Sequence, residues 1–236
     1  MNVGVKYCGT WTDHSGYGSA NRAFIAALYA AGVDVTTELI VQVVEKADHG
    51  WVGKLCENLL DRKIDYKIKI IHLTPDMYPR YMEKDKYNIG HLFWETDRLP
   101  KEWIAPINKM QEIWTSSPQM ADLFRNSGVT VPIYSFPQPV DISEADKPYE
   151  RYDIPEHKGF LFYSVFQWIE RKNPKTLLQA YWETFTGRTD VSLLLKTYRV
   201  NYSEEEYQRI QSDIERWKRE SHLVHFPRVI LITKLL

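Results

Sequence analysis

Residues 1–35, MNVGVKYCGTWTDHSGYGSANRAFIAALYAAGVDV, carry the pattern that decides the fold. The apolar run MNVGVKY predicts a buried strand, and GSANRAFIAALYAAG has its apolar residues at helical spacing up to Gly32. Between the two lies a small, polar loop, HSGYGS, which contains two glycines. A second strand is predicted at VDVTTELI. A strand that returns through a helix to another strand is typical of a right-handed crossover in a parallel sheet.

The same alternation continues to residue 141. Ser117 is the N-cap of one predicted helix and Pro118 is its first helical residue. Gly128 lies just past the end of the same helix. Helices are expected at 50–63, 100–110 and 117–128, strands at 66–74, 87–94, 111–117 and 131–141, and a proline-containing turn at 75–79. We therefore predict an α/β domain with a mostly parallel, Rossmann-like sheet over residues 1–141.

A charged, proline-containing stretch without apolar periodicity follows and predicts a linker over residues 142–158. Strands and helices then alternate again from residue 159 to residue 236. Pro174 and the pair Ser203 and Glu206 mark two helix starts. Strands are expected at 160–166, 191–198 and 222–232, and helices at 173–187 and 203–220. Since about three strands fit where a sheet usually has five or six, we expect a second, incomplete Rossmann-like domain that the end of the chain truncates.

Composition excludes several classes of protein. The 30 basic and 31 acidic side chains leave a net charge of -1, so the composition gives no sign of the positive excess that nucleic-acid binding needs. No apolar run reaches the roughly 18 residues of a membrane span, and the N-terminus lacks the features of a secretory signal. The two cysteines, Cys8 and Cys56, fit a reducing compartment, and a cytoplasmic protein is expected. The 8 tryptophans and 15 tyrosines suit sugar rings or a partner surface, or they simply pack in the core.

Three stretches, taken in order, resemble one known family. They are SGYGSANRAFIAALYAAGVDV, the passage IGHLFWETDRLPKEW…IWTSSPQMADLFRNSGVTVPIYSFPQPVD, and FLFYSVFQWIERKNPKTLLQAYWETF. This order is similar to that of retaining GT-B glycosyltransferases of the family 4 (group 1) type. The resemblance implies a GT-B fold with an acceptor-side and a donor-side domain. It also implies a nucleotide-sugar-dependent hexosyltransferase whose acceptor is a glycan, a lipid-linked molecule or a protein, with peripheral membrane contact left open.

The glycine loop, Ser15, Gly16, Tyr17 and Gly18, is a candidate wall of the cleft in such an enzyme. Glycine lacks a Cβ, so main-chain amides can approach a ligand, and the following helix presents the positive end of its dipole to an anion. The alternative is an ordinary turn between a strand and a helix. The spacing is not the dinucleotide motif G-x-G-x-x-G. Asp13 and His14, which precede the loop, are open to the same two interpretations.

Arg171 and Lys172 precede a predicted helix, where paired cations can bind a diphosphate and stabilise a leaving nucleoside diphosphate. The alternative is a solvated surface pair, but the resemblance favours the diphosphate. Lys196 is a cation near the end of a strand and a third candidate for binding the diphosphate. The alternative is that Lys196 is a structural residue. The family commonly carries a further basic residue upstream, where this chain has the neutral Gln167.

His91 and Glu95 are the candidate catalytic residues, because His91 lies near the end of a strand and Glu95 follows it closely. A histidine there could donate a hydrogen bond to the transferred sugar, and a carboxylate could bind hydroxyls. The alternatives are a histidine satisfied by the local main chain and a solvated acidic turn. Asp97 and Arg98 are weaker candidates, since they could pair with one another.

No metal site is expected. His222 and His225 lack a completing carboxylate or cysteine, and the resembled family positions its donor without a metal motif. The segment with two glutamates that holds the donor in that family has no counterpart here. A non-catalytic carbohydrate- or protein-binding module therefore remains an alternative. A nicotinamide-dependent oxidoreductase is disfavoured by the missing glycine motif.

Overall fold

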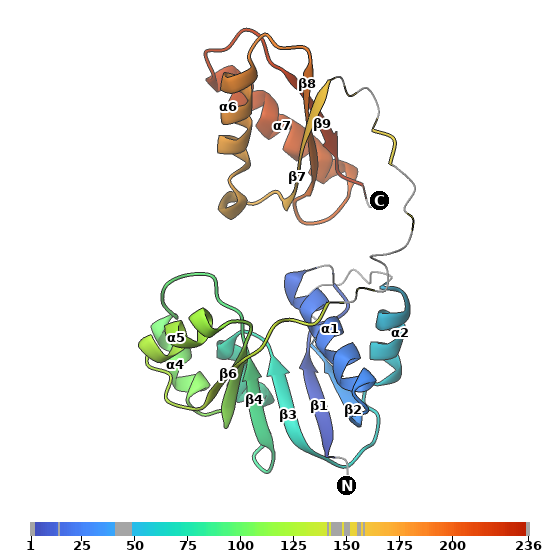
Figure 1. Ribbon diagram of the computed structural model, residues 1–236, viewed down its shortest axis with the longest axis vertical. Coiled ribbons are helices and arrows are strands. Elements are labelled where there is room, and N and C mark those ends of the chain that lie inside the picture. Colours follow the sequence, from blue (N-terminus) through green and yellow to red (C-terminus); the bar gives the residue numbers. More distant parts are fainter. Residues whose placement is uncertain are drawn as a thin grey trace. The chain divides into compact units, whose positions relative to one another are not determined.

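The computed structural model describes residues 3–13, 15–40, 49–140, 142, 148, 152–154, 157 and 159–234. The chain folds as two compact units, Met1–Lys147 and Pro148–Leu236, and each has its own parallel sheet (Figure 1). His14 and most of the predicted linker over 142–158 lie outside the described residues. Among the described residues, no helix combines the length and the apolar character that crossing a membrane requires.

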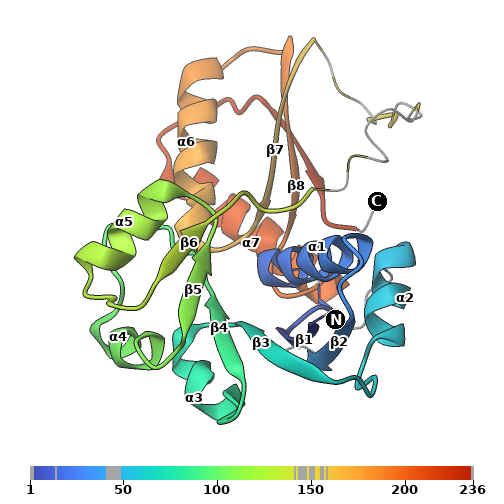
Figure 2. The same cartoon turned by 60° about the horizontal axis from the view of Figure 1, so that its bottom comes forward.

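The first unit is built on six parallel strands in the order β2-β1-β3-β4-β5-β6, which confirms the predicted parallel α/β architecture. The strands of this sheet and the helices beside them are visible in Figure 2. In chain order, the elements are β1 (Gly4–Gly9), α1 (Gly16–Ala30), β2 (Val35–Leu39), α2 (Gly50–Asn58), β3 (Tyr66–His72), α3 (Tyr78–Tyr81), β4 (Tyr87–His91), α4 (Lys101–Ile107), β5 (Glu112–Thr115), α5 (Pro118–Asn126) and β6 (Ile133–Ser135).

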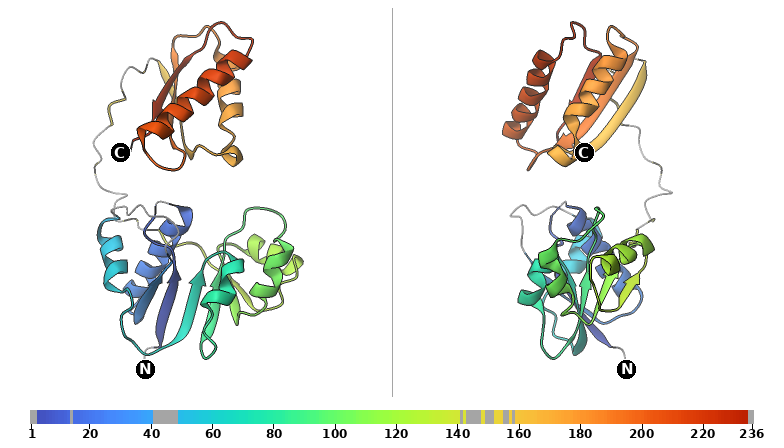
Figure 3. Two further views of the ribbon diagram at one scale, coloured as in Figure 1. Left: turned by 180° about the vertical axis from the view of Figure 1, so that it is seen from behind. Right: turned by 90° about the vertical axis from the view of Figure 1, so that its left-hand side faces the viewer.

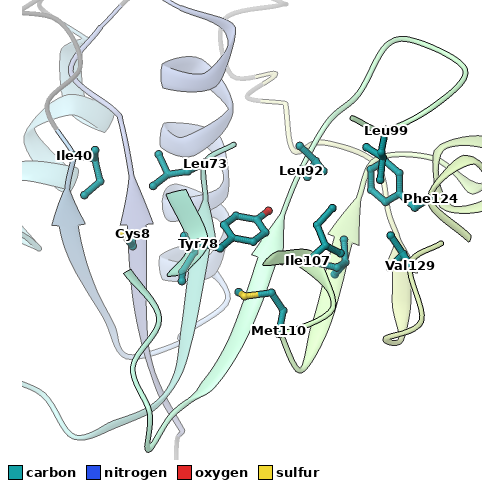
Figure 4. Packing of buried hydrophobic residues seen from close by; sticks show 12 residues of the cluster. Cys8, Ile40, Leu73, Tyr78, Leu92, Leu99, Ile107, Met110, Phe124 and Val129 are labelled. Atoms are coloured by element: carbon teal, nitrogen blue, oxygen red, sulfur yellow. The ribbon is translucent and has the colours of Figure 1, made fainter. Parts of the chain in front are cut away.

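Both faces of this sheet carry an apolar cluster. Neighbouring residues of one strand belong to different clusters, as Tyr7 and Cys8 of β1 do, because successive side chains point to opposite faces. One cluster joins β1 and β3 to α1 and α2 and includes Phe24 and Ile25 of α1. The other surrounds Tyr78 and continues towards α4 and α5 (Figure 4). Burial on two sides is the usual condition of a parallel sheet.

Several local predictions differ from the structure. The strands expected at 131–141 and 222–232 are shorter, at Ile133–Ser135 and Arg228–Ile232, and each has a proline, without an amide hydrogen for a ladder bond, close to one end. The helix expected at 50–63 ends at Asn58.

The expected turn at 75–79 is a 3-10 turn, Pro75–Met77, that continues into α3, because the buried Tyr78 anchors this segment in the core. The strand expected over 87–94 ends at His91. After a last ladder bond from the Leu92 amide to the Trp114 carbonyl, the chain leaves the sheet, and the Trp94 amide lies 3.4 Å from the Met120 sulfur.

The second unit has three parallel strands in the order β7-β8-β9. Its elements are β7 (Phe160–Gln167), α6 (Pro174–Phe185), β8 (Val191–Tyr198), α7 (Glu204–Glu220) and β9 (Arg228–Ile232). Leu193 and Leu195 of β8 pack against both helices, around Trp182 of α6 and Ile210 of α7. Both helices therefore cover the same face of this sheet (Figure 3).

Side-chain caps begin the helices of the second unit. Asn173 adopts a left-handed conformation, with φ of 51°, and its side chain accepts a bond from the Thr176 amide. Ser203 caps α7 by accepting a bond from the Glu206 amide at 3.4 Å. The predicted pair Ser203 and Glu206 thus makes only one of the two hydrogen bonds of a capping box. The Glu206 carboxylate instead lies near two arginines, and the Ser203 amide donates to the Asn201 side chain.

Candidate functional site

The carboxyl ends of β1, β3 and β4 form the candidate site of the first unit. The strand order reverses at β1, which has β2 on one side and β3 on the other. Ligands of open α/β sheets bind at the carboxyl ends of the strands where the order reverses. The chain that follows β1 at this edge is the predicted glycine loop, which ends in the N-terminus of α1.

Asp13 holds this loop in shape. Its Oδ2 accepts a hydrogen bond from the Thr10 hydroxyl at 2.5 Å, and its Oδ1 accepts one from the Ser15 amide at 2.8 Å. Burial alone would raise the pKa of Asp13, but bonds from Ser15 and Thr10 and the charge of Arg22 lower it below its ordinary value. Arg22 also donates to the carbonyl of Asp13. Asp13 is thus an ionised structural anchor with 6% of its surface exposed.

Two glycines allow close packing at this edge. A Cβ on Gly18 would lie 2.5 Å from Asp13 Oδ1, and a Cβ on Gly9 would lie 2.1 Å from Asn21 Oδ1. Around Gly16, by contrast, a Cβ would meet nothing within 4 Å. Gly18 and Gly9 are therefore required by the fold, whereas Gly16 leaves open space.

The predicted loop residues form the N-terminus of α1, and one of the main-chain amides there is already bound by a side chain. The Ser15 side chain caps α1 by accepting a bond from the Gly18 amide at 3.0 Å. Ser15 and Gly16 are exposed and Gly18 is buried. The amides of Gly16 and Tyr17 belong to the first turn, where a helix offers no internal partner. These two amides and the positive end of α1 can bind an anion.

Tyr17 and Glu95 are 78 positions apart in the sequence, yet the charge of Glu95 acts on the Tyr17 hydroxyl in the structure. Burial raises the pKa of the Tyr17 hydroxyl to about 12, and the negative charges of Asp76 and Glu95 add to this effect. Glu95 is exposed, in the loop after β4. The predicted carboxylate therefore lies within electrostatic range of Tyr17 in the predicted glycine loop. Asp97 and Arg98 lie further along the same loop and line a separate pocket of about 470 Å³ beside α4.

His91 ends β4 and stacks on His72, which ends β3. The ring centroids are 3.9 Å apart and the ring planes differ by 22°. A 2.6 Å hydrogen bond joins His72 Nδ1 to the Tyr7 hydroxyl, and the ring of Phe24 lies 4.4 Å from that of His91. Burial lowers the pKa of His91 to about 3 and holds the pKa of His72 well below its ordinary value, so both rings are neutral at pH 7.

His91 has no exposed surface. In this conformation it acts on a ligand only through neighbouring groups and not by direct contact. Among the described residues, neither ring nitrogen of His91 has a hydrogen-bond partner. Nε2 of His72 has none there either. Buried polar atoms without partners are uncommon, and they mark the histidine pair as a functional candidate.

His72 is a residue that the sequence interpretation missed. The signal was present, since the strands at 66–74 and 87–94 both continue as His-Leu, at His72 and at His91. The two strands are parallel neighbours, and His72 pairs in register with His91. A repeated residue at the ends of adjacent strands predicts a side-by-side pair.

In the second unit, Arg171 and Lys172 lie in a 3-10 turn, Glu170–Lys172, between β7 and α6. Both side chains are exposed, and Asn173 then caps α6. The structure thus gives the predicted cations an accessible position at a helix N-terminus.

Lys196 lies inside β8 and not at its end. Its ammonium group donates to the Lys234 carbonyl at 2.7 Å and lies 5.0 Å from the centre of the Tyr202 ring. Burial lowers its pKa. The cation that follows the end of β8 is Arg199, which the sequence interpretation missed and which lies 3.7 Å from Asp213. Arg199 was signalled by its place directly after VSLLLKTY.

Arg199 lines a pocket of about 500 Å³ in the second unit, beside the N-terminus of α6. The stacked rings of Trp168 and Trp217, 5.6 Å apart, form its apolar wall. Arg171 and Lys172 are not among its lining residues. A groove of similar size in the first unit lies between α1 and α2, away from the histidine pair. In the described part of the chain, no cluster of side chains suits a metal ion.

No model of a known protein family matches this chain, and no curated protein matches it.

Proposed function

We propose that this chain is a retaining glycosyltransferase of the GT-B, family 4 type, which transfers a sugar from a nucleotide-sugar to a glycan or lipid-linked acceptor. One observation carries the proposal. In each unit, the candidate ligand-binding segment follows the first strand directly and leads into a helix N-terminus, after β1 in one and after β7 in the other. These are two of the stretches on which the resemblance rests.

In this proposal Arg171 and Lys172 bind the diphosphate of the donor. Two exposed cations at the start of α6 add to the positive end of the helix dipole. Negative charge develops on the nucleoside diphosphate as the bond to the sugar breaks, and cations held at that place stabilise it. Lys196 contributes less to this role, because the Lys234 carbonyl already occupies its ammonium group.

The first unit in this proposal binds the acceptor and the reacting sugar. The amides of Gly16 and Tyr17 and the carboxylate of Glu95 are polar groups at one edge of its sheet. His91 acts as a positioning residue, since it stacks on His72 beneath this edge and has no exposed surface.

The test is calorimetric binding of nucleoside diphosphates and of the matching nucleosides to the double variant Arg171→Ala/Lys172→Ala. Bonds to charged groups contribute about 1.5–3 kcal/mol each, so diphosphate affinity should fall at least about tenfold while nucleoside affinity is unchanged. The matched control is Arg216→Ala/Lys218→Ala on α7, which removes the same charge elsewhere in the unit. Equal losses for diphosphate and nucleoside, or equal losses in both variants, contradict the assigned role.

A non-catalytic carbohydrate-binding module is the second candidate, and the complete burial of His91 favours it. The same calorimetry decides between the two. Glycan binding without any nucleotide binding supports the module, and nucleoside diphosphate binding that depends on Arg171 and Lys172 supports the transferase.

A further inference from the structure

A pocket of about 500 Å³ lies in the second unit between the N-terminus of α6 and the helix α7. Its volume is within the range of pockets that bind small molecules, about 300–1,000 Å³. Trp168 and Trp217, which line it, belong to the apolar cluster between the sheet and the two helices. Among the described residues that line it, none lies on the edge strands β7 and β9. The pocket is therefore formed on the helix-covered face and not at an edge where strands pair.

The apolar wall of this pocket is held in place by its own contacts. The Trp168 Nε1–H group donates to Asp213 Oδ2 at 3.1 Å, and the planes of the Trp168 and Trp217 rings differ by 13°. Only 5% of Trp168 and 8% of Trp217 is exposed, so each ring offers its margin to a ligand. Ile169 and Pro174 extend the apolar surface. Because this wall is ordered before a ligand arrives, binding loses little side-chain freedom.

Three polar side chains of the pocket keep hydrogen-bonding capacity. Arg199 lies 3.5 Å from Glu206 and 3.7 Å from Asp213, and both distances exceed those of an ordinary hydrogen bond. The Asn173 oxygen accepts the bond that caps α6, which leaves its NH2 group without a partner in the described part of the chain. The Glu170 carboxylate likewise has no partner among the described residues. Two donor groups and one acceptor group are thus left to bind a ligand.

The charges that line the pocket cancel. Glu170 and Asp213 are opposed by Lys175 and Arg199, and Lys175 is also bound to Glu220 at 2.7 Å. A phosphate or carboxylate therefore finds no excess of positive charge here. A neutral ligand with hydroxyl groups fits better, because each hydroxyl both donates and accepts hydrogen bonds.

We propose that this pocket binds a neutral saccharide of one or two rings. The C–H groups of a sugar ring contact the margins of the tryptophan rings, and its hydroxyls donate to Glu170 and accept from Arg199 and Asn173. Arg171 and Lys172 do not line the pocket, so this site is separate from the diphosphate site proposed above. The proposal also does not depend on sugar transfer, since it needs no group of the first unit.

The experiment is saturation-transfer difference NMR of the whole chain with glucose, galactose, mannose, N-acetylglucosamine and maltose as probes. For ligands of this size we expect a dissociation constant on the order of 1 mM for at least one probe. Two-dimensional proton–nitrogen NMR of the isotope-labelled chain locates the contact through the indole N–H signals. Those of Trp168 and Trp217 should shift with the same dissociation constant, while that of Trp11, which follows β1 in the first unit, should not.

Glu170→Ala removes the acceptor and should raise the dissociation constant at least about tenfold, since bonds to charged groups are the stronger ones. Asn173→Asp keeps an oxygen that caps α6 but loses the NH2 donor, so it should weaken binding several-fold. The matched control is Glu183→Ala, which removes an exposed carboxylate of α6 that does not line the pocket. It should leave binding unchanged. Near-ultraviolet circular dichroism verifies that the variants remain folded.

Three results overturn the proposal. They are binding of none of the probes, an equal loss in both glutamate variants, and a shift of the Trp11 signal in place of the other two. The last result would locate the saccharide in the first unit, where it supports the acceptor site of the proposed function instead. The double variant of Arg171 and Lys172 should keep saccharide binding, so failure of the diphosphate site and failure of this site are distinguishable.

Discussion

The strands β1 and β7 are each the first strand of their unit. β7 has the more apolar composition of the two, yet it is the more exposed one. β1, GVKYCG, contains a lysine, and nearly all of it is buried. β7, FLFYSVFQ, has no charge and three phenylalanines, and much of it is exposed. Within the described part of the chain, β1 has a strand on each side and apolar clusters on both faces, whereas β7 has one neighbouring strand and helices on one face. The number of neighbours, and not the apolar content of a strand, determines how far it is buried.

The largest expected effect comes from Trp182→Ala in the core of the second unit. Trp182 has no exposed surface and contacts Phe226 edge to face. The loss of a buried tryptophan costs about 3–5 kcal/mol. If each unit has its own core, the second should unfold at lower urea concentration while the first is unchanged, as measured by hydrogen exchange of each peptide.

The control for this prediction is Trp51→Ala, because Trp51 is 59% exposed. It should change stability by less than about 0.5 kcal/mol. If Trp182→Ala destabilises both units equally, the separate-core interpretation is wrong.

The next effect is a dependence of the first unit on pH. Burial holds the pKa of His72 and His91 below 6.5, so the folded state keeps both rings neutral while the unfolded state takes up protons. Their contribution is complete above pH 6.5 and is lost as the pH falls. Each histidine can change stability by up to about 1.36 kcal/mol per pH unit, so lowering the pH from about 7.5 to about 5.5 should cost about 2–3 kcal/mol.

Urea titrations across this pH range measure the effect. The second unit is an internal control, since its histidines at 157, 222 and 225 are exposed. The lowered pKa values of Asp13 and Glu83 contribute only below about pH 4.5. The variant His72→Gln/His91→Gln should remove the slope between about pH 5.5 and 6.5, and a slope that persists in it contradicts the assignment.

A smaller effect distinguishes two glycines of the same loop. Gly18→Ala brings a Cβ within 2.5 Å of Asp13 Oδ1 and should cost about 1–3 kcal/mol. Gly16→Ala meets nothing within 4 Å and should be neutral or stabilise α1 by up to about 1 kcal/mol. Thermal unfolding of the two variants measures the difference. Equal effects would show that Asp13 does not constrain the loop.

The smallest effects concern helix caps, one in each unit. Ser117→Ala removes a bond from the Met120 amide to the Ser117 side chain, and Ser203→Ala removes the corresponding bond from the Glu206 amide. Each should cost about 1 kcal/mol. Peptide-resolved hydrogen exchange should show the loss in the first unit for Ser117→Ala and in the second for Ser203→Ala. A loss that spreads across both units would mean that they unfold together.

Most of the fold could be predicted from the sequence because its signals are local. Apolar periodicity, the caps Ser117 and Ser203 and the first helical residue Pro174 indicate where helices begin, and the structure confirms these three starts. The short helix α3 could not be predicted, because it depends on the contact of Tyr78 with the distant core. The end of β4 at His91 likewise depends on the neighbouring strand β5.

The candidate site was less predictable, since its geometry depends on which strands are adjacent. The position of Arg171 and Lys172 before a helix follows from Pro174 alone. The stacking of His91 on His72 depends on the pairing of β3 with β4, which a single strand does not encode. The bond from Lys196 to Lys234 joins residues 38 positions apart and has no local signal.

The contact between Gly9 and Asn21 also constrains how this sequence can vary. A Cβ at position 9 would lie 2.1 Å from Asn21 Oδ1. As long as Asn21 remains, only the hydrogen of Gly9 fits there. Asn21 in turn donates to the Tyr17 carbonyl at 2.8 Å and so supports the first turn of α1. An alanine at position 9 therefore requires a smaller residue at position 21 and another support for that turn. In an alignment of relatives, these two positions should change together, 12 residues apart, as a covarying pair that links the first strand to the first helix.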